Sequence, residues 1–378
     1  MKYYIIAGEA SGDLHGSNLI KEIKKLDEAA SIRCWGGDLM QAEGATLVKH
    51  YRDLAFMGFA EVVMNLKTIF NNLKFCKEDI LKFQPDVLVL IDYPGFNLRI
   101  AEWAKTVNGQ QSTVNCKTVF YISPQVWAWK ESRVPKMKET IDEMIVILPF
   151  EKEYYKDKWK WDVDYVGHPL VQVVEEFKQS AAGHQPSANN IIALLPGSRK
   201  QEIAKKLPIM LEVSRHFPQY QFILAKAPGL EDAFYESFVR NYTNVSSVRN
   251  KTYQLLTEAK AALVTSGTAT LETALFGVPE VVCYKGSNIS YQIAKRLIKI
   301  KYIALVNLIM DKPVVKELIQ NELTVKNLKQ ELSKLLFDEA KKEQFRKDYE
   351  DLKNILSAGG NASANAAKIV VDTAKNKN

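Results

Sequence analysis

Short apolar segments alternate with longer segments of helical periodicity along most of the chain, and this alternation restricts the fold more than any other feature. Strands that read as continuous apolar runs between helices are typical of a parallel sheet covered on both faces. The pattern therefore predicts an α/β fold built from doubly wound parallel sheets. The predicted strands are Tyr3–Ala7, Asp86–Ile91, Thr118–Ile122 and Met144–Leu148, followed by Ile191–Leu195, Tyr220–Leu224, Ala261–Thr265 and Glu280–Tyr284.

A polar stretch after about residue 175 divides this alternation into two parts. It is rich in small and polar residues and is broken by a glycine and a proline, which is typical of a linker. The 378 residues are enough for two cores. We expect a first domain at 1–175, a second domain at 188–347 and a helical tail from Lys312. The sequence leaves open whether a helix at about 348–378 packs back on the first domain.

Several classes of protein are excluded by what the sequence lacks. The longest apolar runs fall far short of the roughly 20 residues that a membrane-spanning helix needs, and the first residues lack the pattern of a secretory signal. The four cysteines and five histidines show no metal-ligand spacing, so we expect no disulfide and no metal site in a cytoplasmic protein. A net charge of +7 suggests anionic partners, and no motif indicates nucleic acid. No feature fixes the oligomeric state.

The loops that follow the predicted strands of the first half hold polar side chains where ligands bind in such sheets. Glu9, Ser11 and Asp13 lie in a glycine-containing loop that lacks the dinucleotide-binding spacing. Asp92 ends an apolar strand, where a carboxylate is costly unless it caps a turn or performs chemistry. Asn97 lies near the start of the next helix. Each residue is equally explained by a turn or a helix cap.

Two further segments of the first half carry candidate ligand contacts. Gln125, Trp127 and Trp129 follow a strand. The rings of the two tryptophans suit a sugar or a lipid, although both rings are also suited to a core. His168 lies just before the linker, where it either lines a cleft or packs at a hinge.

The loops of the second half favour a phosphate ligand. Arg199 follows a strand in the sequence PGSR, and its guanidinium matches phosphate oxygens. Ser266, Gly267 and Thr268 form a turn before a helix whose N-terminus suits a diphosphate, and Glu272 lies one turn further. A surface arginine and an ordinary N-cap are the alternatives. No Walker motif is present, and we regard Asp162-Val163-Asp164 as a chance match to a metal-binding DxD.

Together these loops resemble those of the lipid-A-disaccharide synthase family. The resemblance covers most of the chain up to about residue 320. It rests on AGEASGD (7–13), MGFAEV (57–62), PDVLVLIDYPGFN (85–97), YISPQVWAW (121–129), LPFEKEYY (148–155), YVGHPL (165–170), LLPGSR (194–199), TSGTATLE (265–272) and LVNLIM (305–310). The combination of SPQVWAW with GEASGD and PGSR is the most specific part.

The resemblance implies a GT-B glycosyltransferase with two Rossmann-like domains that face each other across a cleft. It also implies transfer of 2,3-diacylglucosamine from UDP-2,3-diacylglucosamine to 2,3-diacylglucosamine 1-phosphate (lipid X). The expected products are the β-1,6-linked lipid A disaccharide 1-phosphate and UDP, formed with inversion and without a metal, in lipopolysaccharide biosynthesis. Such an enzyme has no cofactor.

The resemblance also assigns roles to individual residues. Asp92 is the first choice for the general base and Glu9 the second. The family often has another acid in the Asp92 loop, at the position that Gly95 occupies here, so a mechanism that needs that second acid is in doubt. Residues expected to bind UDP are Arg199, Ser266, Gly267, Thr268, Glu272 and Asn307, and those expected near the acceptor or cleft are Ser11, Asp13, Asn97, Gln125, Trp127 and His168.

Acylated substrates imply access to the cytoplasmic leaflet of the inner membrane. Residues 60–75 place apolar side chains at helical spacing with lysines among them, which is typical of a helix at an anionic interface and also of a core-facing helix. We expect a peripheral membrane enzyme. The predicted contacts are Val62, Leu66, Ile69, Phe70 and Leu73.

Two other functions stay open at this point. One is another GT-B enzyme of UDP-sugars, either a different lipid glycosyltransferase or an epimerase. The other is a non-catalytic protein that binds a nucleotide sugar or a lipid.

Overall fold

The computed structural model describes residues 1–54, 66–109, 115–181, 190–227, 229–287, 291–292, 296 and 300–376. The chain forms two compact units, the first made of Met1–Pro169 and Ser357–Asn378 and the second of Leu170–Leu356. This division lies before the boundary at residue 175 that the sequence suggested. The reason is that helix α8 (Pro169–Ser180) buries Leu170 and Val174 in the core of the second unit.

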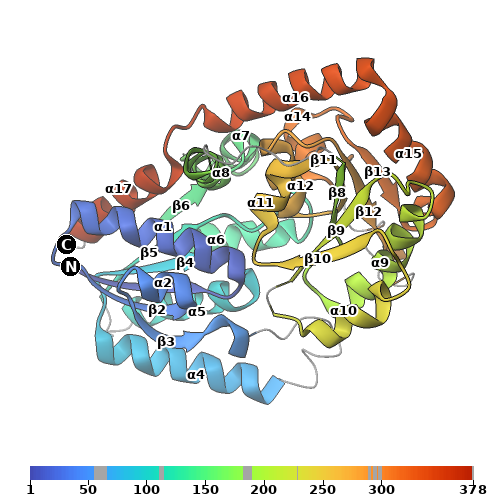
Figure 1. Cartoon of the computed structure of the whole chain (residues 1–378). Coiled ribbons are helices and arrows are strands. Elements are labelled where there is room, and N and C mark those ends of the chain that lie inside the picture. Colours follow the sequence, from blue (N-terminus) through green and yellow to red (C-terminus); the bar gives the residue numbers. More distant parts are fainter. Residues whose placement is uncertain are drawn as a thin grey trace. The chain divides into compact units, whose positions relative to one another are not determined.

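The described residues of the first unit contain a seven-stranded parallel sheet. Its strands run in the order β3-β2-β1-β4-β5-β6-β7, so the order reverses between β1 and β4. Such a reversal places the loops after both strands at the usual ligand-binding position of an α/β sheet. Strands β2 to β6 are labelled in Figure 1. The strands are β1 (Lys2–Ala7), β2 (Ser31–Gly36), β3 (Thr46–His50), β4 (Val87–Ile91), β5 (Lys117–Tyr121), β6 (Glu143–Val146) and β7 (Asp164–Tyr165).

Helices cover both faces of this sheet. α1 and α17 pack against each other, and both contact β4. On the other face, Leu88 and Leu90 of β4 pack in one buried cluster with Ile80 of α4 and Ile100 of α5. The helices of the unit are α1 (Ala10–Leu26), α2 (Asp38–Ala42), α4 (Leu66–Phe83), α5 (Pro94–Gly109), α6 (Val134–Thr140), α7 (Pro149–Trp159) and α17 (Ala362–Lys375), with 3-10 turns η1 (Tyr51–Asp53) and η2 (Glu131–Arg133).

The described residues of the second unit contain a six-stranded parallel sheet in the order β10-β9-β8-β11-β12-β13, which reverses between β8 and β11. Its strands are β8 (Ile191–Leu195), β9 (Gln221–Lys226), β10 (Val245–Arg249), β11 (Ala259–Thr265), β12 (Glu280–Tyr284) and β13 (Lys316–Ile319). Besides α8, its helices are α9 (Lys200–Ser214), α10 (Asp232–Val239), α11 (Thr252–Glu258), α12 (Thr268–Leu275), α14 (Leu305–Met310), α15 (Val325–Phe337) and α16 (Glu339–Ser357), with the 3-10 turn η3 (Gln320–Glu322).

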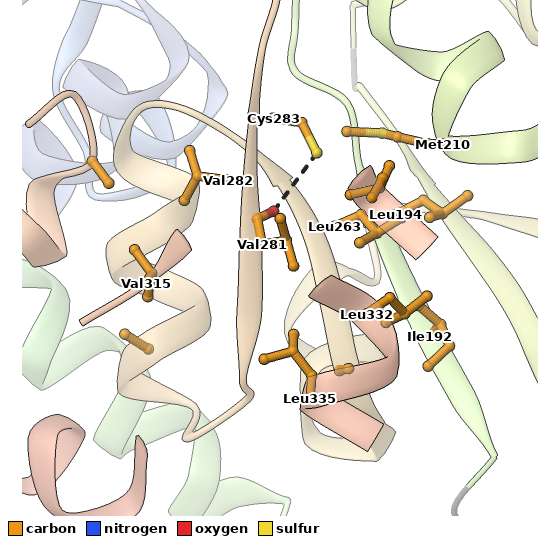
Figure 2. Close-up of a cluster of buried hydrophobic side chains, with 14 of the residues drawn as sticks. Ile192, Leu194, Met210, Leu263, Val281, Val282, Cys283, Val315, Leu332 and Leu335 are labelled. Atoms are coloured by element: carbon orange, nitrogen blue, oxygen red, sulfur yellow. Dashed lines mark hydrogen bonds between the residues drawn. The ribbon is translucent and has the colours of Figure 1, made fainter. Parts of the chain in front are cut away.

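Strand β8 shows why its apolar sequence produces a sheet that is buried on both faces. Ile192 and Leu194 point into a cluster with Leu263 and Leu332 (Figure 2). The alternate residues of β8, Ala193 and Leu195, belong to a second cluster on the opposite face with Leu255 and Val264. Because side chains alternate along a strand, both faces need apolar residues when helices cover both. The predicted α/β class is therefore confirmed.

The tail from Lys312 differs from the prediction of helix throughout. Lys316–Ile319 forms the edge strand β13, which pairs with β12. The remaining tail is helical. All four cysteines lie within the described residues and are buried free thiols. Within the described residues, no helix combines the length and the apolarity that crossing a bilayer requires.

The C-terminal segment joins the first unit through a close backbone contact. A Cβ atom added to Gly359 would lie 2.3 Å from the backbone nitrogen of Gly167. The Asn365 side-chain amide donates to the carbonyl oxygens of Gly359 at 2.6 Å and Val166 at 3.3 Å. These contacts hold the segment that leads into α17.

Gly359→Ala is expected to lower the free energy of unfolding by about 2 kcal/mol, because the added methyl group meets backbone that has no room to move. Denaturant unfolding of the full chain measures this. Gly95→Ala is the matched control in the same unit, since nothing lies within 4 Å of its added Cβ, and we expect a change below about 0.5 kcal/mol. Equal stability of the two variants would contradict the prediction.

Candidate functional site

Glu9 and Asp92 leave the first sheet side by side. Ala7 at the end of β1 pairs with Ile91 at the end of β4, so the loops that begin after them start from adjacent positions at the point where the strand order reverses. Burial and, to a smaller extent, the nearby charge of Glu9 together raise the pKa of the Asp92 carboxyl to about 6. The structure thus brings together the two acids that the sequence singled out.

The turn that carries Asp92 has an unusual backbone. Asp92 and Tyr93 both adopt the left-handed conformation, with φ of 44° and 49°. Non-glycine residues in this region cost about 1–3 kcal/mol each, and such strain persists only where the surroundings impose it. The Asp92 backbone nitrogen donates to Tyr121 O at 3.0 Å. The ring of Tyr93 lies against Gly8, where an added Cβ would come within 2.3 Å of it.

Asn97 holds this turn in place. Its side chain is fully buried, and its amide donates to the carbonyl oxygens of Asp92 at 2.7 Å, Ile91 at 3.2 Å and Ile6 at 3.4 Å. It therefore links the ends of β1 and β4. The sequence suggested an acceptor contact for Asn97, whereas its hydrogen bonds position the Asp92 loop.

Two of the other residues expected near the acceptor are buried, and two are exposed. Asp13 is 3% exposed and accepts hydrogen bonds from the backbone nitrogens of Gly37, Leu39 and Met40, which caps α2. His168 is also buried, and burial together with the neighbouring His15 lowers its pKa to about 3. Ser11 and Gln125 are exposed and are the members of this group that are free to meet a ligand.

Glu151 is a site residue to which the sequence analysis gave no role. It is 1% exposed, and its carboxylate accepts hydrogen bonds from the backbone nitrogens of Leu148 at 3.0 Å and Ile147 at 3.3 Å. The indole of Trp127 donates to it at 3.0 Å. Burial, with a small contribution from the charge of Asp92, raises its pKa to about 7. Glu151 therefore couples the Trp127 loop to the acids at the sheet edge.

The neighbouring Trp129 lies within a cluster of cations. Its side chain is 45% exposed. The Lys130 ammonium lies 4.2 Å from the ring centroid, and the Arg133 guanidinium lies 6.0 Å from it. Burial lowers the pKa of Arg133, and the charge of Arg99 lowers it further. Lys130 and Arg133 therefore place two cations at the Trp129 ring, and Arg99 lies near Arg133.

In the second unit, Arg199 is positioned by the loop that joins β8 to α9. It is the N-cap residue of α9, and its side chain is 53% exposed. Its guanidinium lies 3.3 Å from Glu202 Oε1. Gly197 has a φ of +113°, which glycine adopts without strain, and this conformation turns the chain from the strand to the helix. The arginine is thus available to a ligand at this edge.

The turn after β11 lies at the same edge, because β11 pairs with β8. Gly267 has a φ of 136°, and α12 begins at Thr268, which is exposed. The Ser266 hydroxyl donates to Ile303 O at 2.8 Å. The structure therefore places Arg199 and the 266–268 turn after adjacent strands of the sheet.

Glu272 and Asn307 are more enclosed. Burial raises the pKa of Glu272, which accepts a hydrogen bond from the Tyr253 hydroxyl at 2.9 Å. Asn307 is 1% exposed and donates to Glu317 Oε1 and Val315 O, each at 2.9 Å. Glu317 also accepts from the backbone nitrogen of Ile303, whose carbonyl binds Ser266. Asn307 thus stabilises the segment that supports the turn after β11.

Comparison with known proteins decides the family. A sequence model described as lipid-A-disaccharide synthetase matches residues 3–371. The chain is 38% identical to the lipid-A-disaccharide synthase of Geobacter metallireducens, in an alignment that covers 97% of this chain and 96% of that protein. The chain belongs to the lipid-A-disaccharide synthase family. The resemblance inferred from the loops is therefore confirmed, and the expectation of a glycosyltransferase is confirmed with it.

Solved structures agree with the fold expected for a lipid-A-disaccharide synthase. UDP-GlcNAc 2-epimerase from Neisseria meningitidis bound to UDP-GlcNAc matches with a TM-score of 0.63 at 13% identity, over 100% of both chains. The glycotransferase of kitacinnamycin also has a TM-score of 0.63 at 13% identity, over 98% of each chain. At such identity the likeness concerns the fold alone, and it confirms the predicted GT-B class of two parallel-sheet α/β domains.

Proposed function

We propose that the chain transfers 2,3-diacylglucosamine from UDP-2,3-diacylglucosamine to the 6-hydroxyl of lipid X. The products are the β-1,6-linked disaccharide 1-phosphate and UDP. The observation that carries this proposal is that the carboxyl groups of Asp92 and Glu9 lie near each other, after paired strand ends where the strand order reverses, in a member of this family. A carboxyl group with a pKa of about 6 is ionised at neutral pH and is still basic enough to accept a hydroxyl proton.

The chemical step follows from these roles. Asp92 accepts the proton of the acceptor 6-hydroxyl while that oxygen forms a bond to the anomeric carbon. The bond from the anomeric carbon to UDP breaks on the opposite face, which inverts the configuration, and its electron pair leaves with UDP. Glu9 and burial keep the pKa of Asp92 in the useful range.

The second unit supplies groups that suit the departing UDP. Arg199 offers a guanidinium to the diphosphate, and the N-terminus of α12 offers backbone N–H groups. Preorganised donors of this kind stabilise developing negative charge, which supports a metal-independent reaction. Asp162 and Asp164 belong to the first unit, and Asp164 lies in β7. The DxD sequence is therefore not part of the unit that carries the proposed UDP contacts.

The first unit offers a surface for the phosphorylated acceptor. Ser11 and Gln125 are exposed, and Trp129 lies among Lys130, Arg133 and the nearby Arg99. A sugar face stacks on an aromatic ring, and a phosphate is attracted by the cations. We assign the acceptor to this unit.

The direct test combines the full-length protein with UDP-2,3-diacylglucosamine and lipid X, with and without EDTA. We expect disaccharide 1-phosphate and UDP, detected by mass spectrometry, in equal yield in both reactions. Absence of product would overturn the proposed function. Product that disappears with EDTA would overturn only metal independence.

Helix α4 supports peripheral association with an anionic membrane surface. Phe70 is 66% exposed, and it lies between the exposed Lys67 and Lys74 at helical spacing. A stripe of an aromatic residue flanked by lysines suits a bilayer interface. Leu73 is 7% exposed and packs in the core, so we remove it from the predicted contacts, and Ile69 packs partly against that core. Val62 and the Leu66 side chain lie outside the described residues.

Phe70→Ser is expected to weaken binding to phosphatidylglycerol-containing vesicles by about 30-fold, because it removes roughly 2 kcal/mol of apolar transfer free energy. Vesicle sedimentation measures this, and the melting temperature should not change because Phe70 is 66% exposed. Phe337→Ser is the control, since Phe337 is 59% exposed on a helix of the second unit. Equal vesicle binding by the two variants would remove α4 from the proposed membrane surface.

A further inference from the structure

Lys206 is a buried lysine at the ligand-binding edge of the second sheet. It is 2% exposed, it lies on α9, and its ammonium donates to the hydroxyl of Thr265, the last residue of β11. Burial lowers its pKa, although Glu202 and Cys283 oppose this. A buried cation costs free energy that an apolar side chain would not. The neighbouring core residues Ile203 and Leu207 show that this helix face otherwise packs apolar groups.

Lys206 belongs to a charged network that begins at the proposed diphosphate contact. Glu202 lies between two cations, with Oε1 at 3.3 Å from the Arg199 guanidinium and Oε2 at 3.6 Å from the Lys206 ammonium. The same edge is tightly packed, since a Cβ on Gly197 would lie 3.3 Å from Glu202 Oε2 and 3.5 Å from the Thr265 side chain. The three charged groups carry a net charge of +1 from two cations and one anion.

We infer that Lys206 is a positioning residue for the donor diphosphate, because it shares the negative charge of Glu202 with Arg199 and so leaves guanidinium donors of Arg199 for the diphosphate. The inference rests on the proposed function, which supplies the nucleoside diphosphate ligand. Within the described residues, the ion pairs of Glu202 are those with Arg199 and Lys206. Without Lys206, Glu202 retains Arg199 as its partner, and its negative charge repels the diphosphate. The bond to Thr265 also fixes the strand end from which the Ser266–Thr268 turn begins.

The test measures UDP binding to the full-length protein by titration calorimetry, together with melting temperature. Lys206→Met is expected to weaken UDP binding at least tenfold with little change in melting temperature, because methionine fills the buried volume and Glu202, whose side chain is 39% exposed, keeps Arg199 as its partner. Lys205→Met is the control, since Lys205 is the adjacent exposed residue of the same helix. It is expected to change UDP affinity by less than twofold.

A rescue experiment separates positioning from a structural role. In Lys206→Met, the negative charge of Glu202 is no longer neutralised by Lys206. If this charge causes the loss of UDP affinity, then Glu202→Gln combined with Lys206→Met should restore the affinity to within about threefold of the parent. A melting temperature that falls while UDP affinity is unchanged would overturn the inference. If both fall, the double variant decides, since restored affinity supports the inference and unrestored affinity overturns it. A parent protein that binds no UDP would instead overturn the proposed function itself.

Discussion

Replacing Asp92 by asparagine is expected to lower kcat for disaccharide formation by about 10³-fold, within the range that a general base contributes. Asparagine keeps the shape of the side chain but does not accept a proton from the 6-hydroxyl. The KM values should change little, because the Asp92 backbone remains held by Tyr121 and Asn97. Steady-state kinetics with both substrates measures this. Asp157→Asn removes an exposed carboxylate of the same unit and should leave kcat unchanged.

The pH dependence gives a second reading of the same assignment. Below a pKa of about 6, Asp92 is protonated and is no longer a base for the hydroxyl proton, so kcat/KM should fall about tenfold per pH unit. Glu9→Gln removes a charge that raises this pKa, so the acidic limb should move to lower pH. The shift should be partial, because burial is the larger cause. If Asp92→Asn retains full kcat while Glu9→Gln abolishes it, the base is Glu9.

The central strands of both sheets were predictable from sequence for a physical reason. Val87–Ile91 and Ile191–Leu195 are buried on both faces, so every position must be apolar and the run is conspicuous. Lys316–Ile319 pairs on one side only, at the sheet edge, and its first residue is exposed. An edge strand tolerates polar residues, and this one was therefore included in the predicted helical tail.

The sequence predicted which strand-end loops hold the candidate residues, but not the contacts that each of these residues makes. Asp92 and Arg199 were identified as candidates because both follow apolar runs that predict strands. Which polar residues face a ligand depends on tertiary contacts, so Asp13 and Asn97 were assigned to the acceptor, although they hold backbone groups. Glu151 lies one turn inside a helix, and only the fold brings it to Trp127 and the charge of Asp92.

Replacing Arg199 by methionine is expected to lower kcat/KM for the UDP donor by about 10²-fold, the loss typical of removing one preorganised donor to developing charge. The methionine keeps an unbranched stem but loses the guanidinium, so negative charge on the departing UDP is less stabilised. The kcat/KM of Arg199→Lys should lie between those of the parent and of Arg199→Met, because lysine keeps the positive charge but not the bidentate geometry of the guanidinium. UDP titration should show weaker binding in the same order.

Arg215→Met provides a matched control for this prediction. Arg215 lies just beyond the other end of α9, is also 53% exposed, and pairs with Glu212 at 3.1 Å in the same i,i+3 arrangement as Arg199 with Glu202. Exposed ion pairs of this type contribute little to stability, so both methionine variants should have the melting temperature of the parent. Only Arg199→Met should lose donor kcat/KM. An equal loss in both variants would show that general positive charge attracts the donor, and the assignment of Arg199 to the diphosphate would then fail.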